Sequence, residues 1–240
     1  MKLKHRRMRD LLLYAIGLQR NYWPRVTVEQ PELRLRDLLP GLIANELWGR
    51  SPDEFRFIQI GAFDGNDMLH DTICRFGLRG ALVEPQPVVF EKLQETYADQ
   101  PQLQFVNAAI AHRPGKITMY TQRSRLSSLC SFDPEHLKKH SVPASDIVEV
   151  EVDAITFSEL LERTGIAQPN LLQVDAEGFD YEILKMVDYR ALQPAIVRYE
   201  QHHMTKPQRN EIAEMLAALG YQLFAERMDV LAYRSPAASR

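Results

Sequence analysis

Cysteine is scarce in this chain: its 240 residues include only two, Cys74 and Cys130. Two cysteines exclude a disulfide framework and a four-cysteine zinc site. Free, partly buried thiols are typical of a reducing compartment, so we expect a cytoplasmic protein.

A long hydrophobic run is missing as well. The longest apolar stretch, residues 11–16, is far shorter than the roughly 20 residues that span a bilayer. Basic residues before it resemble the start of a signal peptide, but no small-residue cleavage site follows. We expect residues 4–20 to form a helix that docks on the main domain. Contact of this basic helix with a membrane surface is the less favoured alternative, because stable anchoring usually takes two signals.

Charge of one sign is not in excess, since 29 basic residues stand against 32 acidic ones and the net charge is −3. This balance argues against a dedicated nucleic-acid binder, and we expect no nucleic-acid partner. Hydrophobic residues make up 45% of the chain and charged residues 25%. Both fractions are typical of a folded globular protein and argue against a disordered one.

From residue 53 onward, short apolar runs alternate with segments of helical periodicity. The expected strands are 55–60, 81–83, 104–106, 171–174 and 195–199, and the expected helices are 67–76, 87–97, 156–163, 179–187 and 207–219. This alternation predicts an α/β fold with a doubly wound, mostly parallel sheet. The last two strands, 221–225 and 230–233, are too close in sequence for a crossover helix, so they form an antiparallel hairpin.

Two further regions complete the organisation of the chain. Residues 116–120 and 147–152 are extended stretches within the main domain. Residues 1–52 include a second helix over 32–48, whose apolar side chains recur at helical spacing. We therefore expect an N-terminal helical extension, residues 1–52, and one main domain, residues 53–240.

Polar and acidic residues follow the predicted strands at the point where each strand ends. They are Gly61 to Gly65, Glu84, Asn107 with Ala108, Asp175 to Gly178, and Glu200 to His203. Ligands of open α/β sheets bind outside the carboxyl ends of the strands. The sequence therefore predicts a ligand site at this edge of the sheet.

The glycine turn and the acid after the second strand indicate the kind of ligand. Gly61 and Gly65 lack the G-x-G-x-x-G spacing of dinucleotide binders, and Asp64 between them would repel a pyrophosphate. Glu84 follows Gly65 by about 20 residues, the spacing of an acid that binds both ribose hydroxyls. The alternative is a surface acid before Pro85. Together these features favour a nucleoside without phosphates, such as S-adenosylmethionine.

The sequence resembles the FkbM family of S-adenosylmethionine-dependent methyltransferases in segments that occur in the family's order. These segments are Phe57 to Gly65, Ala81 to Pro85, Asn107 to Ile110, Ser131 to Leu137, Leu171 to Asp180, and Tyr199 to His203. The run Asp175-Ala176-Glu177-Gly178 is the most specific of them. The resemblance implies a Rossmann-like, seven-stranded methyltransferase sheet that ends in an antiparallel hairpin.

The same resemblance implies roles for individual residues. Gly61 and Gly65 would shape the loop around the methionine part, Glu84 would bind the ribose, and Asn107 and Ala108 would lie near the adenine. Asp175 would face the methionine amino group or the reacting centre. Many members have an acid in place of Gln59 and an asparagine in place of Phe63, so Asp64, Asp71 and Asp175 are candidates to neutralise the ammonium. The cofactor-binding candidates are Gln59, Gly61, Ala62, Asp64, Gly65, Asp71, Glu84, Asn107, Ala108 and Asp175.

Methyl transfer to a hydroxyl needs a group that takes the hydroxyl proton, and carboxylates or histidine suit that role. We expect Glu177 or His202 to be this base and Asp175 to position the acceptor. The alternatives are a helix N-terminal acid for Glu177 and an exposed loop side chain for His202. Acids such as Asp180 and Glu200 could also bind a divalent metal, but no compact ligand spacing is present, so no metal is expected.

The expected function is O-methylation of a sugar, glycolipid or polyketide-type acceptor, with S-adenosylhomocysteine as the product. The resemblance implies this acceptor class, and the partner is then a small molecule or a glycan. The alternative is a catalytically inactive scaffold, which Gln59 and Phe63 would support. A nicotinamide-dependent oxidoreductase is disfavoured by the missing dinucleotide motif and the terminal hairpin. A homodimer is left open.

Overall fold

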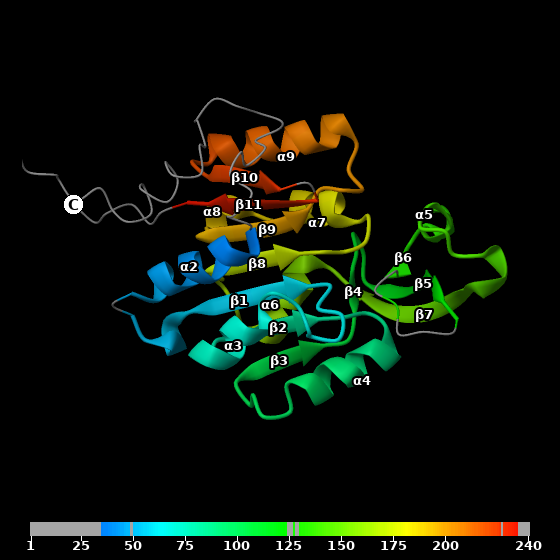
Figure 1. The fold of residues 1–240 in the computed structure, drawn as a ribbon, viewed down its shortest axis with the longest axis horizontal. Helices are drawn as coiled ribbons and strands as arrows, with labels where there is room; N and C mark the ends of the chain where they lie inside the picture. The colour runs from blue at the N-terminus through cyan, green and yellow to red at the C-terminus, as the bar shows by residue number, and fades with distance from the viewer. Residues whose placement is uncertain (1–34, 49, 124–126, 128–129, 227, 235–240) are drawn as a thin grey trace, which may run out of the picture.

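The main sheet of the computed structural model has seven strands within the described residues, in the order β10-β11-β9-β8-β1-β2-β3 (Figure 1). The structure describes residues 35–48, 50–123, 127, 130–226 and 228–234. The strands are β1 (Arg56–Ile60), β2 (Arg79–Val83), β3 (Leu103–Val106), β8 (Leu171–Val174), β9 (Ile196–Glu200), β10 (Gln222–Glu226) and β11 (Asp229–Tyr233). The first five are mutually parallel, whereas β11 runs antiparallel to both β9 and β10. The predicted doubly wound sheet with a C-terminal hairpin is confirmed.

The direction of winding reverses between β1 and β8. From β1 the chain adds β2 and β3 on one side, and it then returns to add β8 and β9 on the other side. Connections on the two sides of such a switch point leave in opposite directions, so a crevice opens at the carboxyl ends of the two central strands. The fold therefore places the ends of β1 and β8 at the usual ligand position.

Helices cover both faces of the main sheet, because side chains of each strand alternate between the faces. Phe57 of β1 belongs to the core under α2 (Leu35–Leu47), α3 (His70–Phe76) and α4 (Pro87–Thr96). Its neighbour Ile58 belongs to the core on the other face. That core includes side chains of α6 (Phe157–Thr164), α7 (Asp180–Met186), α8 (Tyr189–Leu192) and α9 (Lys206–Ala218). The result is a three-layer arrangement in which both sheet faces are buried.

Local sequence signals define the ends of two of these helices. Thr156 and Glu159 form a reciprocal capping box at the start of α6, which satisfies backbone N–H groups that have no partner inside the helix. Gly165 ends the helix in the left-handed conformation that glycine adopts easily. Thr205 and Gln208 cap α9 in the same reciprocal way. The sequence therefore predicts both helices to within about one residue.

A second, smaller sheet was not predicted as a unit. Its order is β4-β7-β5-β6, and it projects beside the carboxyl edge of the main sheet (Figure 1). The elements of this region are β4 (Ala109–Ile110), β5 (Gly115–Gln122), β6 (Cys130–Ser131), α5 (Pro134–Lys139) and β7 (Ile147–Ile155). A short 3₁₀ turn, Ala144–Asp146, precedes β7, and another, Pro52–Glu54, precedes β1 of the main sheet. The sequence shows β5 and β7 as extended, but their pairing joins residues that are 25 to 39 positions apart. Local patterning does not specify such a partner.

Helix α2 is packed on the main sheet. Leu39 and Ile43 are fully buried in the core that contains Phe57. The hydroxyl of Tyr233 in β11 donates to Glu46 Oε1 at 2.8 Å, and Asn45 Nδ2 donates to the same hydroxyl at 3.1 Å. The helix thus shares the core of the main domain, and the boundary at residue 52 stays a prediction. The expected helix over 4–20 and the first residues of 32–48 lie outside the described residues. Among the helices that the structure describes, none is long and apolar enough to cross a membrane.

We expect Leu39→Ala to lower the free energy of unfolding by about 2–5 kcal/mol, because it removes a fully buried side chain and leaves a cavity under α2. Urea unfolding followed by circular dichroism measures this loss. The matched control is Trp48→Ala, since Trp48 is 86% exposed just beyond the same helix. This variant should stay within about 0.5 kcal/mol of the native protein. Equal stability of the two variants would show that α2 does not belong to the cooperative core.

Candidate functional site

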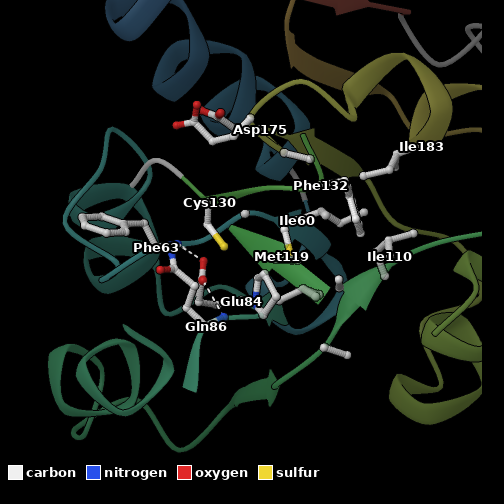
Figure 2. Close-up of a pocket in the computed structure, with 17 residues that line it drawn as sticks. Ile60, Phe63, Glu84, Gln86, Ile110, Met119, Cys130, Phe132, Asp175 and Ile183 are labelled. Atoms are coloured by element: carbon white, nitrogen blue, oxygen red, sulfur yellow. Dashed lines mark hydrogen bonds between the residues drawn. The ribbon is translucent and has the colours of Figure 1, made fainter. Parts of the chain in front are cut away.

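A pocket lies at the carboxyl ends of β1, β2 and β8, where the second sheet meets the main sheet (Figure 2). The main sheet and its loops contribute Ile60, Gly61, Phe63, Val83, Glu84, Pro85, Gln86, Ala108, Asp175, Ala176 and Glu177 to the lining. The opposite wall contains Ala109, Ile110, Met119, Cys130, Phe132 and Ile183. One wall is therefore rich in carboxylates and backbone polar groups, and the other is mostly apolar.

Glu84 is the buried acid of this pocket, with 4% of its surface exposed. Its Oε2 accepts a hydrogen bond from the backbone N–H of Phe63 at 3.0 Å, and its Oε1 accepts one from Gln86 at 2.9 Å (Figure 2). Burial raises the pKa of Glu84 to about 7, although both backbone donors lower it. Each carboxylate oxygen can accept a second hydrogen bond, so Glu84 can still bind two ligand hydroxyls.

Phe63 and Gln86 hold the loops on either side of Glu84. Phe63 has φ +48, in the left-handed region where a bulky side chain is uncommon, and its bond to Glu84 helps to keep it there. Gln86 Nε2 donates to the carbonyl of Ser127 at 3.1 Å, and Gln86 Oε1 accepts from the hydroxyl of Thr121 at 2.9 Å. Gln86 thus connects the end of β2 to the second sheet. Gln86 was not among the expected site residues, because its partners Thr121 and Ser127 belong to the region of the second sheet, which was not predicted as a unit.

The two glycines of the turn after β1 are required by close packing. Gly61 has φ +77, and a Cβ at this position would lie 1.7 Å from the carbonyl oxygen of Asp175. Gly65 has φ +82, and its Cβ would lie 2.6 Å from Cε2 of Tyr97 in the segment after α4. Gly61 also lines the pocket, whereas Gly65 is outside the lining. The turn therefore brings β1 and β8 together at their ends.

Gln59 lies outside the pocket lining and is engaged elsewhere. Its Nε2 donates to Oδ2 of Asp67 at 2.6 Å, and Gln173 of the neighbouring strand β8 donates to the same oxygen at 3.2 Å. Asp67 Oδ1 accepts from the backbone N–H of Leu69. No local sequence pattern singles out Asp67. Its partner Gln173 is 106 residues away, and no local signal indicates that contact.

The remaining loop acids and Asn107 are also outside the lining. Asp71 has a fully exposed side chain on α3. Asp64 Oδ1 accepts from the N–H of Asn66 within its own turn. Ala62 is buried with 1% exposed. Asn107 Nδ2 donates to the carbonyls of Glu84 and Pro85 at 2.8 and 3.1 Å, and so it shapes the loop, while the adjacent Ala108 does line the pocket.

The loop after β8 brings Asp175 and Glu177 to the pocket. Burial raises the pKa of Asp175 to about 6, against the opposing charge of Arg198. Glu177 has φ +46, a strained conformation for a residue with a side chain. Asp180 Oδ1 accepts from the N–H of Ala176 at 3.2 Å and Oδ2 from the N–H of Gly178 at 3.3 Å. Asp180 thereby holds the loop, and burial raises its pKa to about 7.

His202 is exposed and outside the lining, whereas its neighbour His203 points to the acids. His203 Nε2 lies 3.5 Å from Glu200 Oε2 and 4.0 Å from Glu177 Oε2. Burial and then the charges of Asp175, Asp180 and Glu177 raise the pKa of Glu200 to about 9. Burial and the imidazoles of His136, His202 and His140 lower the pKa of His203 to about 4. His203 was not selected as a site residue, because a pair of adjacent histidines does not show which of them turns inward.

We expect Gly61→Ala to lower the free energy of unfolding by about 3 kcal/mol or more, since the new Cβ would overlap a backbone carbonyl. Gly77→Ala is the matched control. Gly77 also has a left-handed φ, +61, but no atom lies within 4 Å of its added Cβ. Gly77→Ala should therefore lower the free energy of unfolding by only about 1–2 kcal/mol, which is the conformational cost of a left-handed φ for a residue with a Cβ. Chemical denaturation measures both, and equal losses would contradict the close approach of β1 and β8.

The raised pKa of Glu84 predicts a pH dependence of stability. The folded protein keeps a proton on Glu84 up to about pH 7, whereas the unfolded chain releases it near the ordinary value of 4.5. The free energy of unfolding therefore falls as the pH rises through this window. In Glu84→Gln this fall should be smaller, even though the variant loses a backbone hydrogen bond at every pH. Urea midpoints measured from about pH 4.5 to 8 test this, with exposed Glu91→Gln as the control. Parallel curves for the native protein and Glu84→Gln would contradict it.

One family model and several solved structures match this chain. The family model described as "Methyltransferase FkbM domain" matches residues 59–223. Among solved structures, the METTL16 methyltransferase domain is 11% identical, with 94% of this chain and 77% of that chain covered and a TM-score of 0.49. The N-terminal domain of human METTL16 in complex with SAH is 15% identical, with 93% and 78% covered and a TM-score of 0.45.

A further solved structure is precorrin-6y C5,15-methyltransferase from Geobacter metallireducens GS-15, which is 13% identical. The match covers 85% of this chain and 92% of that chain, with a TM-score of 0.42. A search of curated proteins finds no match. The expected absence of a nucleic-acid partner stays a prediction. Because the family model covers more than half of the chain, the protein belongs to the FkbM family of S-adenosylmethionine-dependent methyltransferases.

Proposed function

We propose that the protein transfers a methyl group from S-adenosylmethionine to a hydroxyl of a sugar, glycolipid or polyketide-type acceptor. The observation that carries this proposal is the carboxylate of Glu84. It is buried at the end of β2, it is held by two backbone N–H groups, and each oxygen can still accept one hydrogen bond. Such a group fits the two hydroxyls of a ribose.

The pocket walls suit the other parts of this cofactor. Ala108 leaves room for a flat base beside the end of β3, and Gly61 lets the ligand approach the backbone after β1. Asp175 supplies a carboxylate toward the methionine end. Among the residues that the structure describes, none that lines the pocket is a Lys or Arg, the side chains that would favour a phosphate. S-adenosylmethionine supplies an activated methyl group on a sulfonium, so the protein mainly has to align the acceptor with it.

The acceptor is expected on the side of the pocket that the second sheet covers. Met119, Cys130 and Phe132 present apolar surface there, and Glu177 lines the same pocket. Apolar surface binds the carbon skeleton of an acceptor, and a carboxylate accepts a hydrogen bond from its hydroxyl. The same carboxylates would repel a phosphodiester backbone. A neutral, hydroxyl-bearing acceptor therefore fits this wall better than a nucleic acid.

Glu177 is our candidate for the group that takes the hydroxyl proton, with Asp175 as a positioning group. Glu177 lines the pocket, whereas His202, the other candidate base, does not. The backbone strain at Glu177 supports a functional role, since residues with left-handed φ and a side chain concentrate at active sites. The carbonyl of Glu177 accepts a hydrogen bond from Ser131 Oγ at 3.0 Å, which ties this loop to the second sheet.

We expect Glu84→Ala to weaken the binding of S-adenosylhomocysteine about tenfold or more, because hydrogen bonds to a charged group contribute about 1.5–3 kcal/mol. Calorimetric titration of the full chain measures this change. Glu91→Ala, an exposed acid on α4, is the control and should bind as the native protein does. Absence of binding by well-folded native protein would contradict the proposed cofactor and favour the inactive scaffold.

We expect Glu177→Gln to reduce methyl transfer about 100-fold or more while S-adenosylhomocysteine binding changes little, because the amide cannot accept the proton. Transfer of a labelled methyl group to a panel of sugar and polyketide hydroxyl acceptors measures the rate. His202→Asn is the comparison, and it should retain near-native transfer because its side chain lies outside the pocket lining. The reverse ranking of the two variants would assign the base to His202.

A further inference from the structure

A cluster of carboxylates and imidazoles lies next to the pocket. Glu177 follows β8, Glu200 ends β9, and His203 lies in the turn after β9. One ligand atom from each of these three side chains lies within 4.8 Å of the other two. His136 of α5 adds a fourth group, with its Nε2 at 3.4 Å from Glu177 Oε2. We call these four residues the His–Glu cluster.

Glu200 is the member whose environment needs an explanation. It is 8% exposed, and its buried Oε2 accepts no hydrogen bond from any residue that the structure describes. A buried polar atom without a partner is costly. His203 Nε2 lies 3.5 Å from this oxygen, which is too long for a good hydrogen bond. The oxygen is thus available to a positively charged group placed between Glu200 and His203.

The distances inside the His–Glu cluster match those between the ligands of a metal ion. Around a tetrahedral ion with bonds of about 2.0–2.1 Å, neighbouring ligand atoms are about 3.3 Å apart. The observed separations are 3.4 Å between His136 and Glu177, 3.5 Å between His203 and Glu200, and 4.0 Å between His203 and Glu177. Two of these separations are therefore close to the value expected around one ion, and the third is longer.

The backbone around the cluster is also specialised. Glu177 and Gly178 both have left-handed φ values, +46 and +101, and this conformation turns the Glu177 side chain between His136 and His203. A Cβ on Gly178 would lie 3.3 Å from Nδ1 of His136, so a larger residue there would crowd the imidazole. Ser131 and Asp180 hold the same loop by hydrogen bonds. Positions fixed in this way are typical of a ligand site rather than of a loose surface cluster.

We propose that the His–Glu cluster binds a divalent first-row transition-metal cation such as Zn²⁺ or Mn²⁺. Two imidazoles with two carboxylates form a mixed nitrogen and oxygen set, which suits these ions, whereas Mg²⁺ and Ca²⁺ prefer oxygen ligands alone. No metal was expected from the sequence, because these ligands are far apart along the chain. The fold brings them together from α5, the loop after β8 and the end of β9.

The location of the metal site next to the pocket gives the ion a role in methyl transfer. This role rests on the proposed function, whereas the binding of the ion does not depend on it. Glu177 belongs both to the cluster and to the pocket lining. An ion held by Glu177 would lie at the acceptor side of the pocket. There it would lower the pKa of a coordinated hydroxyl and orient the acceptor. Glu200 and His203 lie outside the lining, so their substitution separates ion binding from a direct role in proton transfer.

The test is calorimetric titration of chelator-treated, full-length protein with ZnCl₂, MnCl₂ and MgCl₂, without cofactor. We expect one transition-metal ion per chain, with Mg²⁺ much weaker. Glu200→Gln and His203→Asn should each weaken binding about tenfold or more, since each removes one ligand. The control is His112→Asn, because His112 also pairs with a glutamate, Glu182, at 3.2 Å but lies outside the cluster. It should bind the ion as the native protein does.

Thermal unfolding provides a second measurement on the same samples. The ion should raise the Tm of the native protein and of His112→Asn, but not that of Glu200→Gln or His203→Asn. Unchanged affinity in both cluster variants, or no binding by the native protein, would overturn the proposal and leave the cluster as an ion-pair network. Binding of S-adenosylhomocysteine to the metal-free protein is measured in a separate titration. If S-adenosylhomocysteine does not bind, the result counts against the proposed cofactor. If only the metal ion fails to bind, the result counts against the metal site alone.

Discussion

The close approach of β1 and β8 at their carboxyl ends is the constraint on which the site depends. Gly61 allows this approach, because any side chain there would overlap the carbonyl of Asp175. With the two strand ends in contact, the loops that follow them diverge and leave a pocket at the switch point of the sheet. Glu84 from β2 and Glu177 from the loop after β8 then face the same space. The position of these acids in one pocket thus depends on the close contact between Gly61 and the carbonyl of Asp175.

Burial of several carboxyl groups at one sheet edge is the energetic cost of this arrangement. Glu84, Asp175, Asp180 and Glu200 all have raised pKa values, and in each case burial is the main cause. Backbone N–H groups compensate Glu84 and Asp180 by direct hydrogen bonds. No group in the described part of the chain compensates Glu200 Oε2 in this way, so Glu200 differs from the other three acids. Perturbed acids that gather in one cleft are typical of functional sites.

The second sheet converts an open sheet edge into an enclosed site. It adds the apolar wall of Met119 and Cys130, and it is fastened to the main sheet by Gln86 and by the bond from Ser131 to the carbonyl of Glu177. Its helix α5 also carries His136 to the loop after β8. The main sheet therefore supplies the groups that we assign to the cofactor, and the insertion after β3 shapes the side on which we place the acceptor.

Local sequence patterns predict the strands and helices of the main sheet in their order along the chain, the terminal hairpin, and the sheet edge at which the polar and acidic residues gather. These follow from hydrophobic periodicity, capping residues and strand–helix alternation, which act over a few neighbouring residues. Glu84 was found in this way because its spacing from the glycine turn is itself a local signal. The contact of Gln59 with Asp67, the inward position of His203 rather than His202, and the places of Gln86 and His136 beside the pocket appear only in the folded protein. Each of these depends on contacts between segments distant in the chain, and such contacts exist only after the sheet has formed and the second sheet has packed against it.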